Sequence, residues 1–154
     1  MKIKILIDGF LEKGAILRLK KFFNVLIAEE NNKKNFLKKI HNVEGIILKT
    51  TNLSNRELDC AKKLKVISRF GVGYDNLDLK YLKRKKISLR ITAQSNKITV
   101  AEHVLNKIFF FFKKDYQNDK LARNRIFNEK QIYFGKDLYE SNILIFGYGR
   151  IAKE

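Results

Sequence analysis

Two glycine-containing turns carry the residue types that could do chemistry in this chain. The first is Gly147-x-Gly149-x-x-Ala152, which follows the apolar run 143–146. In a dinucleotide site the first glycine permits a tight turn, the second lets the backbone approach a pyrophosphate, and the third position needs a small side chain. A helix that begins there would present free N–H groups to the phosphate. The spacing therefore predicts a phosphate turn between a strand and a helix, although a strand–turn–helix without function also produces this pattern.

The second turn covers residues 69–76 (RFGVGYDN) and follows a β-rich run at 66–68. A loop at the carboxyl end of a parallel strand is where α/β domains usually bind their ligands. Gly71 and Gly73 can turn backbone N–H groups toward an anion. The same residues could equally form a turn that only connects a strand to a helix, so local sequence leaves both interpretations open.

The remaining residues with reactive side chains are few. The two histidines are isolated and there is one cysteine, so the sequence predicts no metal site. We expect His103 to be structural or solvated rather than catalytic. Cys60 is predicted to be a small core residue on the apolar face of a capped helix. Asp75, at the start of a helix, is predicted to be a turn or cap residue rather than an acid catalyst.

The elements that would position the second turn alternate between short β-rich runs and helical stretches. Strands are expected at 4–7, 25–28, 45–48, 66–68 and 87–91, and helices at 11–23, 35–40, 55–63 and 78–85. The Ser54-x-x-Glu57 spacing predicts a capping box at the start of the third helix. A β-α-β-α order implies parallel strands covered by helices. We therefore predict an α/β domain, and five strands in this length suit a flavodoxin-like unit.

The pattern changes after residue 98. Residues 99–114 are strongly apolar with helical spacing, residues 115–141 are polar and are expected to be irregular, and residues 143–146 are expected to form a buried strand. We therefore expect two domains, 1–98 and 99–154.

The net charge of +17 raises the possibility of a nucleic-acid partner. The basic residues are scattered along the whole chain, however, without a basic arm, zinc-finger spacing or an RNP-like aromatic strand. A basic nucleic-acid binder therefore remains only a lesser alternative. No apolar run approaches the ~20 residues of a membrane helix, and the N-terminus lacks the pattern of a signal peptide. The expectation is a cytoplasmic protein with neither a nucleic-acid nor a membrane partner.

Four segments, in order along the chain, resemble the D-isomer-specific 2-hydroxyacid dehydrogenases of the phosphoglycerate dehydrogenase type. They are residues 43–50 (VEGIILKT), 64–78 (LKVISRFGVGYDNLD), 99–103 (TVAEH) and the stretch from GKDL at 135–138 to Ala152. Residues 1–42 agree only in pattern. The resemblance implies a flavodoxin-like parallel-sheet substrate domain, followed by the truncated start of a Rossmann NAD-binding domain.

The resemblance also implies roles for particular residues. The backbone of Val72 and Gly73 would hold the substrate carboxylate, in a turn that faces the pyrophosphate turn across a cleft. Lys49 stands where the family often has an arginine that meets the far anionic group of the substrate, and Lys keeps the charge without the bidentate fork. The implied substrate-binding residues are Lys49, Gly71, Val72 and Gly73, and the implied cofactor-binding residues are Val72, Val100, Gly147, Gly149, Arg150, Ile151 and Ala152.

The implied function is an NAD-dependent oxidation of the CH–OH group of a D-2-hydroxyacid such as 3-phosphoglycerate. The family's catalytic arginine, and its histidine with a carboxylate partner, would lie beyond residue 154. We therefore assign no catalytic residue within this chain and expect it to be the N-terminal portion of a homodimeric enzyme. Departures from the family pattern are Ile91-Thr92-Ala93 in place of Asn-Thr-Pro, and Gln94 in place of a glycine. A non-catalytic flavodoxin-like module that binds a small anion or a partner is the alternative hypothesis.

Overall fold

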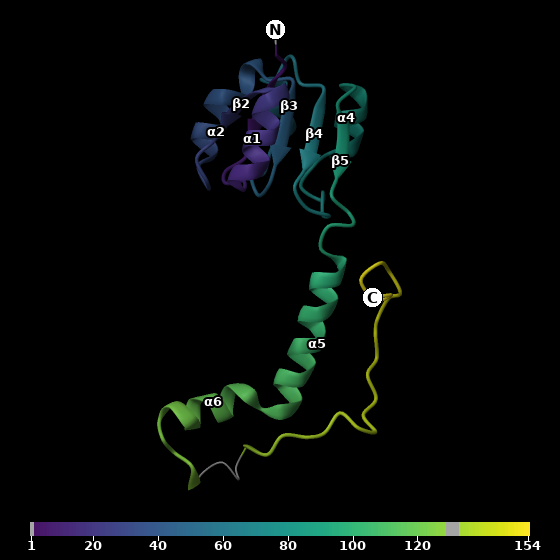
Figure 1. The fold of residues 1–154 in the computed structure, drawn as a ribbon. Coiled ribbons are helices and arrows are strands. Elements are labelled where there is room, and N and C mark those ends of the chain that lie inside the picture. Colours follow the sequence, from purple (N-terminus) through teal and green to yellow (C-terminus); the bar gives the residue numbers. More distant parts are fainter. Residues whose placement is uncertain (1, 129–132) are drawn as a thin grey trace. The chain divides into compact units, whose positions relative to one another are not determined.

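The computed structural model describes residues 2–128 and 133–154 of the chain. The chain forms two compact units, the first ending at Ser95 and the second beginning at Asn96. The first unit holds a sheet with its helices, and the second holds two helices and an extended C-terminal segment (Figure 1).

Five parallel strands form the sheet of the first unit. They are β1 (Lys4–Ile7), β2 (Asn24–Ile27), β3 (Gly45–Leu48), β4 (Val66–Arg69) and β5 (Ser88–Ile91). Their order across the sheet is β2-β1-β3-β4-β5, and all four pairings are parallel. This is the order of a flavodoxin-like doubly wound sheet, so the predicted fold class is confirmed. The register places Leu48 beside Arg69, which aligns the ends of β3 and β4.

The helices of the first unit are α1 (Lys13–Phe22), α2 (Lys33–Lys39), the 3₁₀ turn η1 (Ile40–Asn42), α3 (Asn55–Asp59) and α4 (Leu79–Arg84). The connection from β1 to β2 runs across the sheet in the direction opposite to the later ones. Right-handed crossovers therefore put α1 on one face and α2, α3 and α4 on the other. The core cluster of buried residues lies on the second face and includes Leu6, Phe36, Ile46, Leu48, Leu58, Ile67, Tyr81 and Leu82.

The predicted capping box begins α3. The Ser54 hydroxyl accepts a hydrogen bond from the Glu57 N–H at 3.3 Å, and the Glu57 carboxylate accepts one from the Ser54 N–H at 2.8 Å. Burial opposes ionisation of Glu57, but the Lys33 ammonium and the Ser54 donors outweigh it, so the pKa of this carboxyl lies below its usual 4.5. The box thus satisfies backbone groups that a helix start leaves free.

Helix α3 is shorter than predicted, and this changes the surroundings of Cys60. The helix ends at Asp59 rather than near residue 63, so Cys60 is its C-terminal cap. The thiol is exposed, and the prediction that Cys60 is a core residue is wrong. The apolar side chains that follow at Ala61 and Leu64 take the buried positions instead.

The second unit begins with α5 (Lys97–Lys113) and continues into α6 (Asp115–Arg123). The expectation that residues 115–141 are irregular is wrong for α6. This short helix buries one side chain, Leu121, and lacks the apolar stripe that signals a helix in a sequence. Its ends are stabilised instead by charge, with Asp115 in the first turn and the Arg123–Asp119 ion pair in the last.

Residues 143–146 form no strand, which contradicts the sequence prediction. Leu144 is 91% exposed and Phe146 is fully exposed, so this segment is not buried. A strand needs neighbours to accept and donate its backbone hydrogen bonds, and none of the sheet strands pairs with this segment. Residues 150–153 form a turn rather than the expected helix.

Within residues 2–128 and 133–154, no helix combines the length and the apolar character needed to cross a membrane.

Loss of the cap at Ser54 tests whether α3 depends on its capping box. Replacing Ser54 by Ala should lower the free energy of unfolding by about 1 kcal/mol, because the amide of Glu57 loses its acceptor. Ser54→Thr, which keeps a hydroxyl, is the matched control. Urea unfolding followed by circular dichroism measures both, and equal stability of the two variants would contradict a role for the cap.

Candidate functional site

The candidate site lies where the parallel strands end. The carboxyl ends of β1, β3, β4 and β5 meet at one edge of the sheet, and the loops that follow them begin at Asp8, Lys49, Phe70 and Thr92. The direction of the chain connections reverses between β1 and β3. Open α/β sheets bind ligands outside the carboxyl ends of their strands at such a switch point.

Asp8 occupies this switch point and is 4% exposed. Its carboxylate accepts hydrogen bonds from the Lys49 N–H at 2.8 Å, the Thr51 N–H at 2.9 Å and the Thr51 hydroxyl at 2.6 Å. A buried carboxylate is costly unless such donors surround it. Asp8 therefore fixes the first residues of the loop that leaves β3.

Arg69 is the last residue of β4, and its guanidinium joins two loops. Nε donates to the carbonyl of Gly73 at 3.0 Å, while Nη1 donates to the carbonyls of Leu48, at 3.3 Å, and of Lys49. The end of β3 and the turn after β4 are thus held by one planar group.

In the turn at 71–73, one backbone N–H group donates a hydrogen bond within the described part of the protein and two do not. The Gly71 N–H donates to the Arg69 carbonyl at 2.9 Å and to the Thr92 hydroxyl at 3.0 Å. Among the described residues, the N–H groups of Val72 and Gly73 donate to no acceptor. Val72 is half-buried and Gly73 is exposed, so an anion can approach this pair of amides from solvent.

The Lys49 side chain points away from this turn. Its ammonium donates to the Phe10 carbonyl at 3.0 Å and pairs with the Glu30 carboxylate at 3.1 Å. Both partners follow β1 and β2, which lie on the opposite side of β3 from β4. The structure therefore brings the backbone of Lys49 to the site but directs its ammonium elsewhere.

The residues expected to bind a cofactor lie in the second unit, apart from Val72. Val100 is half-buried in α5, and an ion pair between Lys97 and Glu154 joins the start of that helix to the end of the C-terminal turn. Residues 147 and 149 are open: a Cβ atom built at either glycine meets nothing within 4 Å. Gly147 has a φ of 101°, a conformation that a side chain would strain. Arg150 and Ile151 are exposed in the turn, and Ala152 is half-buried.

The sequence patterns did not identify three residues of the site. Sequence patterns gave Asp8 and Arg69 no role in the site, and they drew attention to Thr92 only as part of an atypical Ile-Thr-Ala segment. Each stands at the end of a strand, and that position is the one signal that sequence offered. Their partners depend on which strands are neighbours, which no local pattern reveals.

Among the described residues no three His, Cys, Asp or Glu side chains come together as a group that could hold a metal ion. His41 and His103 are both exposed.

Comparison with known proteins identifies the family. Residues 5–146 match the model of the D-isomer specific 2-hydroxyacid dehydrogenase catalytic domain. The chain belongs to this family. The resemblance inferred from residues 43–50, 64–78, 99–103 and 135–152 is therefore confirmed at the level of the family.

Relatives of this dehydrogenase family align with nearly the whole chain. A glyoxylate reductase of Pyrococcus furiosus is 25% identical over 163 residues, which cover 99% of this chain and 48% of the relative. Among solved structures, an NADPH-dependent glyoxylate/hydroxypyruvate reductase from Sinorhizobium meliloti, in complex with NADP and malonate, has a TM-score of 0.82 and 21% identity, covering 99% of this chain and 48% of that one. An NAD-dependent formate dehydrogenase from Staphylococcus aureus, in complex with NAD, has a TM-score of 0.81 and 23% identity, covering 99% and 51%. The chain spans about half the length of the curated relatives it matches.

The Thr92 hydroxyl should restrain the turn at Gly71. Thr92→Val removes the hydroxyl at nearly constant volume, so we expect hydrogen exchange of the Gly71 amide to accelerate about fivefold, the equivalent of one hydrogen bond of ~1 kcal/mol. Thr92→Ser keeps the hydroxyl and should exchange at the native rate. Amide exchange followed by NMR gives both rates, and an unchanged rate in the valine variant would show that this bond restrains nothing.

Proposed function

We propose that this chain supplies the substrate-binding domain and the phosphate turn of an NAD-dependent oxidoreductase that acts on the CH–OH group of a D-2-hydroxyacid. The observation that carries the proposal is the pair of unengaged amides at Val72 and Gly73, held in a braced turn at the carboxyl edge of the sheet. Two adjacent N–H groups suit a carboxylate because both of its oxygens can accept a hydrogen bond. Membership of the dehydrogenase family supports the same ligand.

The cofactor is proposed to lie against the turn at 147–152. The open space around Gly147 and Gly149 fits a pyrophosphate that approaches the backbone closely. Arg150 and Ile151 would cover the phosphates, and Val100 and Val72 would line the nicotinamide. The nicotinamide, when bound, supplies the hydride acceptor for the oxidation. Relatives whose structures contain NAD or NADP support a nicotinamide dinucleotide.

For the substrate we propose an acid whose carboxylate is its only anionic group. The sequence resemblance implied 3-phosphoglycerate, with Lys49 meeting its phosphate. The pairing of the Lys49 ammonium with Glu30 argues against that role, because a cation already balanced by a carboxylate attracts a second anion weakly. The likeness to a glyoxylate reductase agrees with a small, singly charged acid. The complete enzyme is proposed to be a homodimer.

Binding of a non-reactive 2-oxoacid analogue tests the proposed carboxylate site. Oxamate added to the ¹⁵N-labelled chain should shift the amide signals of Val72 and Gly73 more than those of the rest of the sheet edge. Gly73→Ala should weaken binding about tenfold, because the added Cβ narrows the path by which the ligand reaches the two amides. The fold should be unaffected, since this Cβ meets only the Asp75 carboxylate, at 3.4 Å.

Gly149→Ala is the matched control for this experiment, since a Cβ there meets nothing within 4 Å and lies in the other unit. Oxamate affinity should be unchanged in this variant. Shifts that avoid residues 72 and 73 would refute the carboxylate site.

Replacing Glu30 tests the proposed substrate class. D-Glycerate and 3-phosphoglycerate differ only in the phosphate, so the ratio of their dissociation constants reports the response to a second anionic group. Glu30→Gln should free the Lys49 ammonium and shift this ratio toward 3-phosphoglycerate about tenfold, the effect expected of one partly shielded charge.

Glu44→Gln is the control, because this substitution removes the same negative charge at a distant place. Glu44 pairs with Lys65 at the amino-terminal edge of the sheet, opposite the candidate site. Calorimetric titration measures all six dissociation constants, one for each ligand with the native chain and with each variant. A native protein that already prefers 3-phosphoglycerate would contradict the proposed substrate class.

A further inference from the structure

We propose that Arg69 is a positioning residue that orients the amides of Val72 and Gly73 toward the substrate carboxylate, and that Asp8 anchors the strand end against which Arg69 acts. This inference rests on the proposed function, since it concerns the same carboxylate site. Neither side chain would touch the substrate. Both would act through a continuous path of hydrogen bonds.

The turn itself has few means of holding its shape. It contains Gly71 and Gly73, and glycine loses more conformational freedom on ordering than any other residue. Gly71 has a φ of 151°. Among residues 2–128 and 133–154, the side chains that hydrogen-bond to residues 70–73 are those of Arg69 and Thr92. Thr92 holds the first glycine, which leaves Arg69 to hold the second.

Arg69 holds Gly73 at a defined point. Nε donates to the Gly73 carbonyl at 3.0 Å, and this carbonyl belongs to the peptide unit that follows the two free amides. Nη1 reaches the carbonyls at the end of β3, so the guanidinium spans from one strand end to the next turn. A planar group with fixed donor directions transmits orientation, which a single ammonium cannot do.

Asp8 completes the path on the other side of β3. Its carboxylate accepts the Lys49 N–H at 2.8 Å, and the carbonyl of the same residue accepts from Arg69. The backbone of Lys49 is therefore held on both sides. The path runs from Asp8 through Lys49 and Arg69 to Gly73, and it crosses the ends of β1, β3 and β4 at the switch point of the sheet.

Variants of Arg69 separate orientation from charge. Arg69→Lys keeps the positive charge but loses the fork, and Arg69→Gln loses both. If Arg69 orients the turn, both variants should bind oxamate about tenfold more weakly, and the NMR order parameters of the amides at residues 72 and 73 should fall. If it contributed only its charge, the lysine variant would bind as the native chain does.

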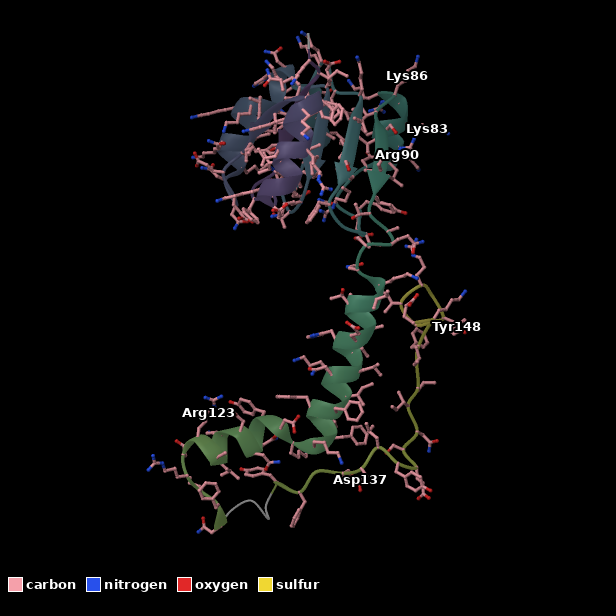
Figure 2. The ribbon with its side chains drawn as sticks, in the orientation of Figure 1. Lys83, Lys86, Arg90, Arg123, Asp137 and Tyr148 are labelled. Carbon is pink, nitrogen blue, oxygen red and sulfur yellow. The ribbon has the colours of Figure 1, made fainter. Side chains whose placement is uncertain are left out.

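Arg90→Gln is the control, because Arg90 is an exposed arginine on the edge strand β5 (Figure 2) and makes no ion pair among the described residues. Its oxamate affinity should stay native. Asp8→Asn tests the distal end of the path and should weaken binding about threefold, since an amide oxygen replaces only part of the acceptor set. It also provides a second variant should Arg69→Gln fail to fold.

Three outcomes of the oxamate titrations decide the matter. Weaker binding in Arg69→Lys, with an unchanged melting temperature and native binding in Arg90→Gln, supports the positioning role. Native binding in Arg69→Lys overturns it and leaves the carboxylate site standing. No binding of oxamate by the native chain overturns the proposed function, and the positioning role with it.

Discussion

A buried carboxylate at the switch point of the sheet constrains the rest of the candidate site. Asp8 is the one charged side chain that the described residues bury, and in that part of the chain it forms no ion pair. Its charge is balanced by two backbone N–H groups and one hydroxyl, all from the loop after β3. An unsatisfied charge at this depth would cost several kcal/mol, so the loop has little freedom to leave. The fixed loop also fixes the position of the Lys49 carbonyl, which accepts a hydrogen bond from Arg69.

The two units differ in how they satisfy their apolar side chains. The first has a core of buried residues that runs from the strands into α2, α3 and α4. In the second, Leu121 is the one buried hydrophobic side chain among the described residues, and α5 buries none. Phe111 on α5 is 69% exposed. The candidate carboxylate site therefore rests on a well-packed scaffold, whereas the candidate phosphate turn rests on a unit whose apolar groups remain largely accessible to solvent.

Sequence patterns predicted those elements whose apolar residues recur at the spacing of a helix or in the short runs of a strand. All five strands of the first unit were predicted to within two residues at either end, because short runs of β-branched residues between polar turns have few other stable arrangements. The capping box was predicted for the same local reason. The predictions failed where no periodic burial exists, as at α6, or where a strand-like segment finds no neighbour, as at residues 143–146.

The amino-acid sequence by itself determined the α/β order, the family and the place of the turn at 71–73, because each depends on neighbouring residues in the chain. Tertiary structure alone decided which amides of that turn remain free. The Thr92 hydroxyl, just after β5, accepts the Gly71 N–H, and Arg69 at the end of β4 donates to the Gly73 carbonyl. It also decided that the Lys49 ammonium meets Glu30, 19 residues earlier, rather than the turn. Hydrogen bonds between strand ends follow the order β2-β1-β3-β4-β5, and that order is set by how the helices pack on the two faces of the sheet.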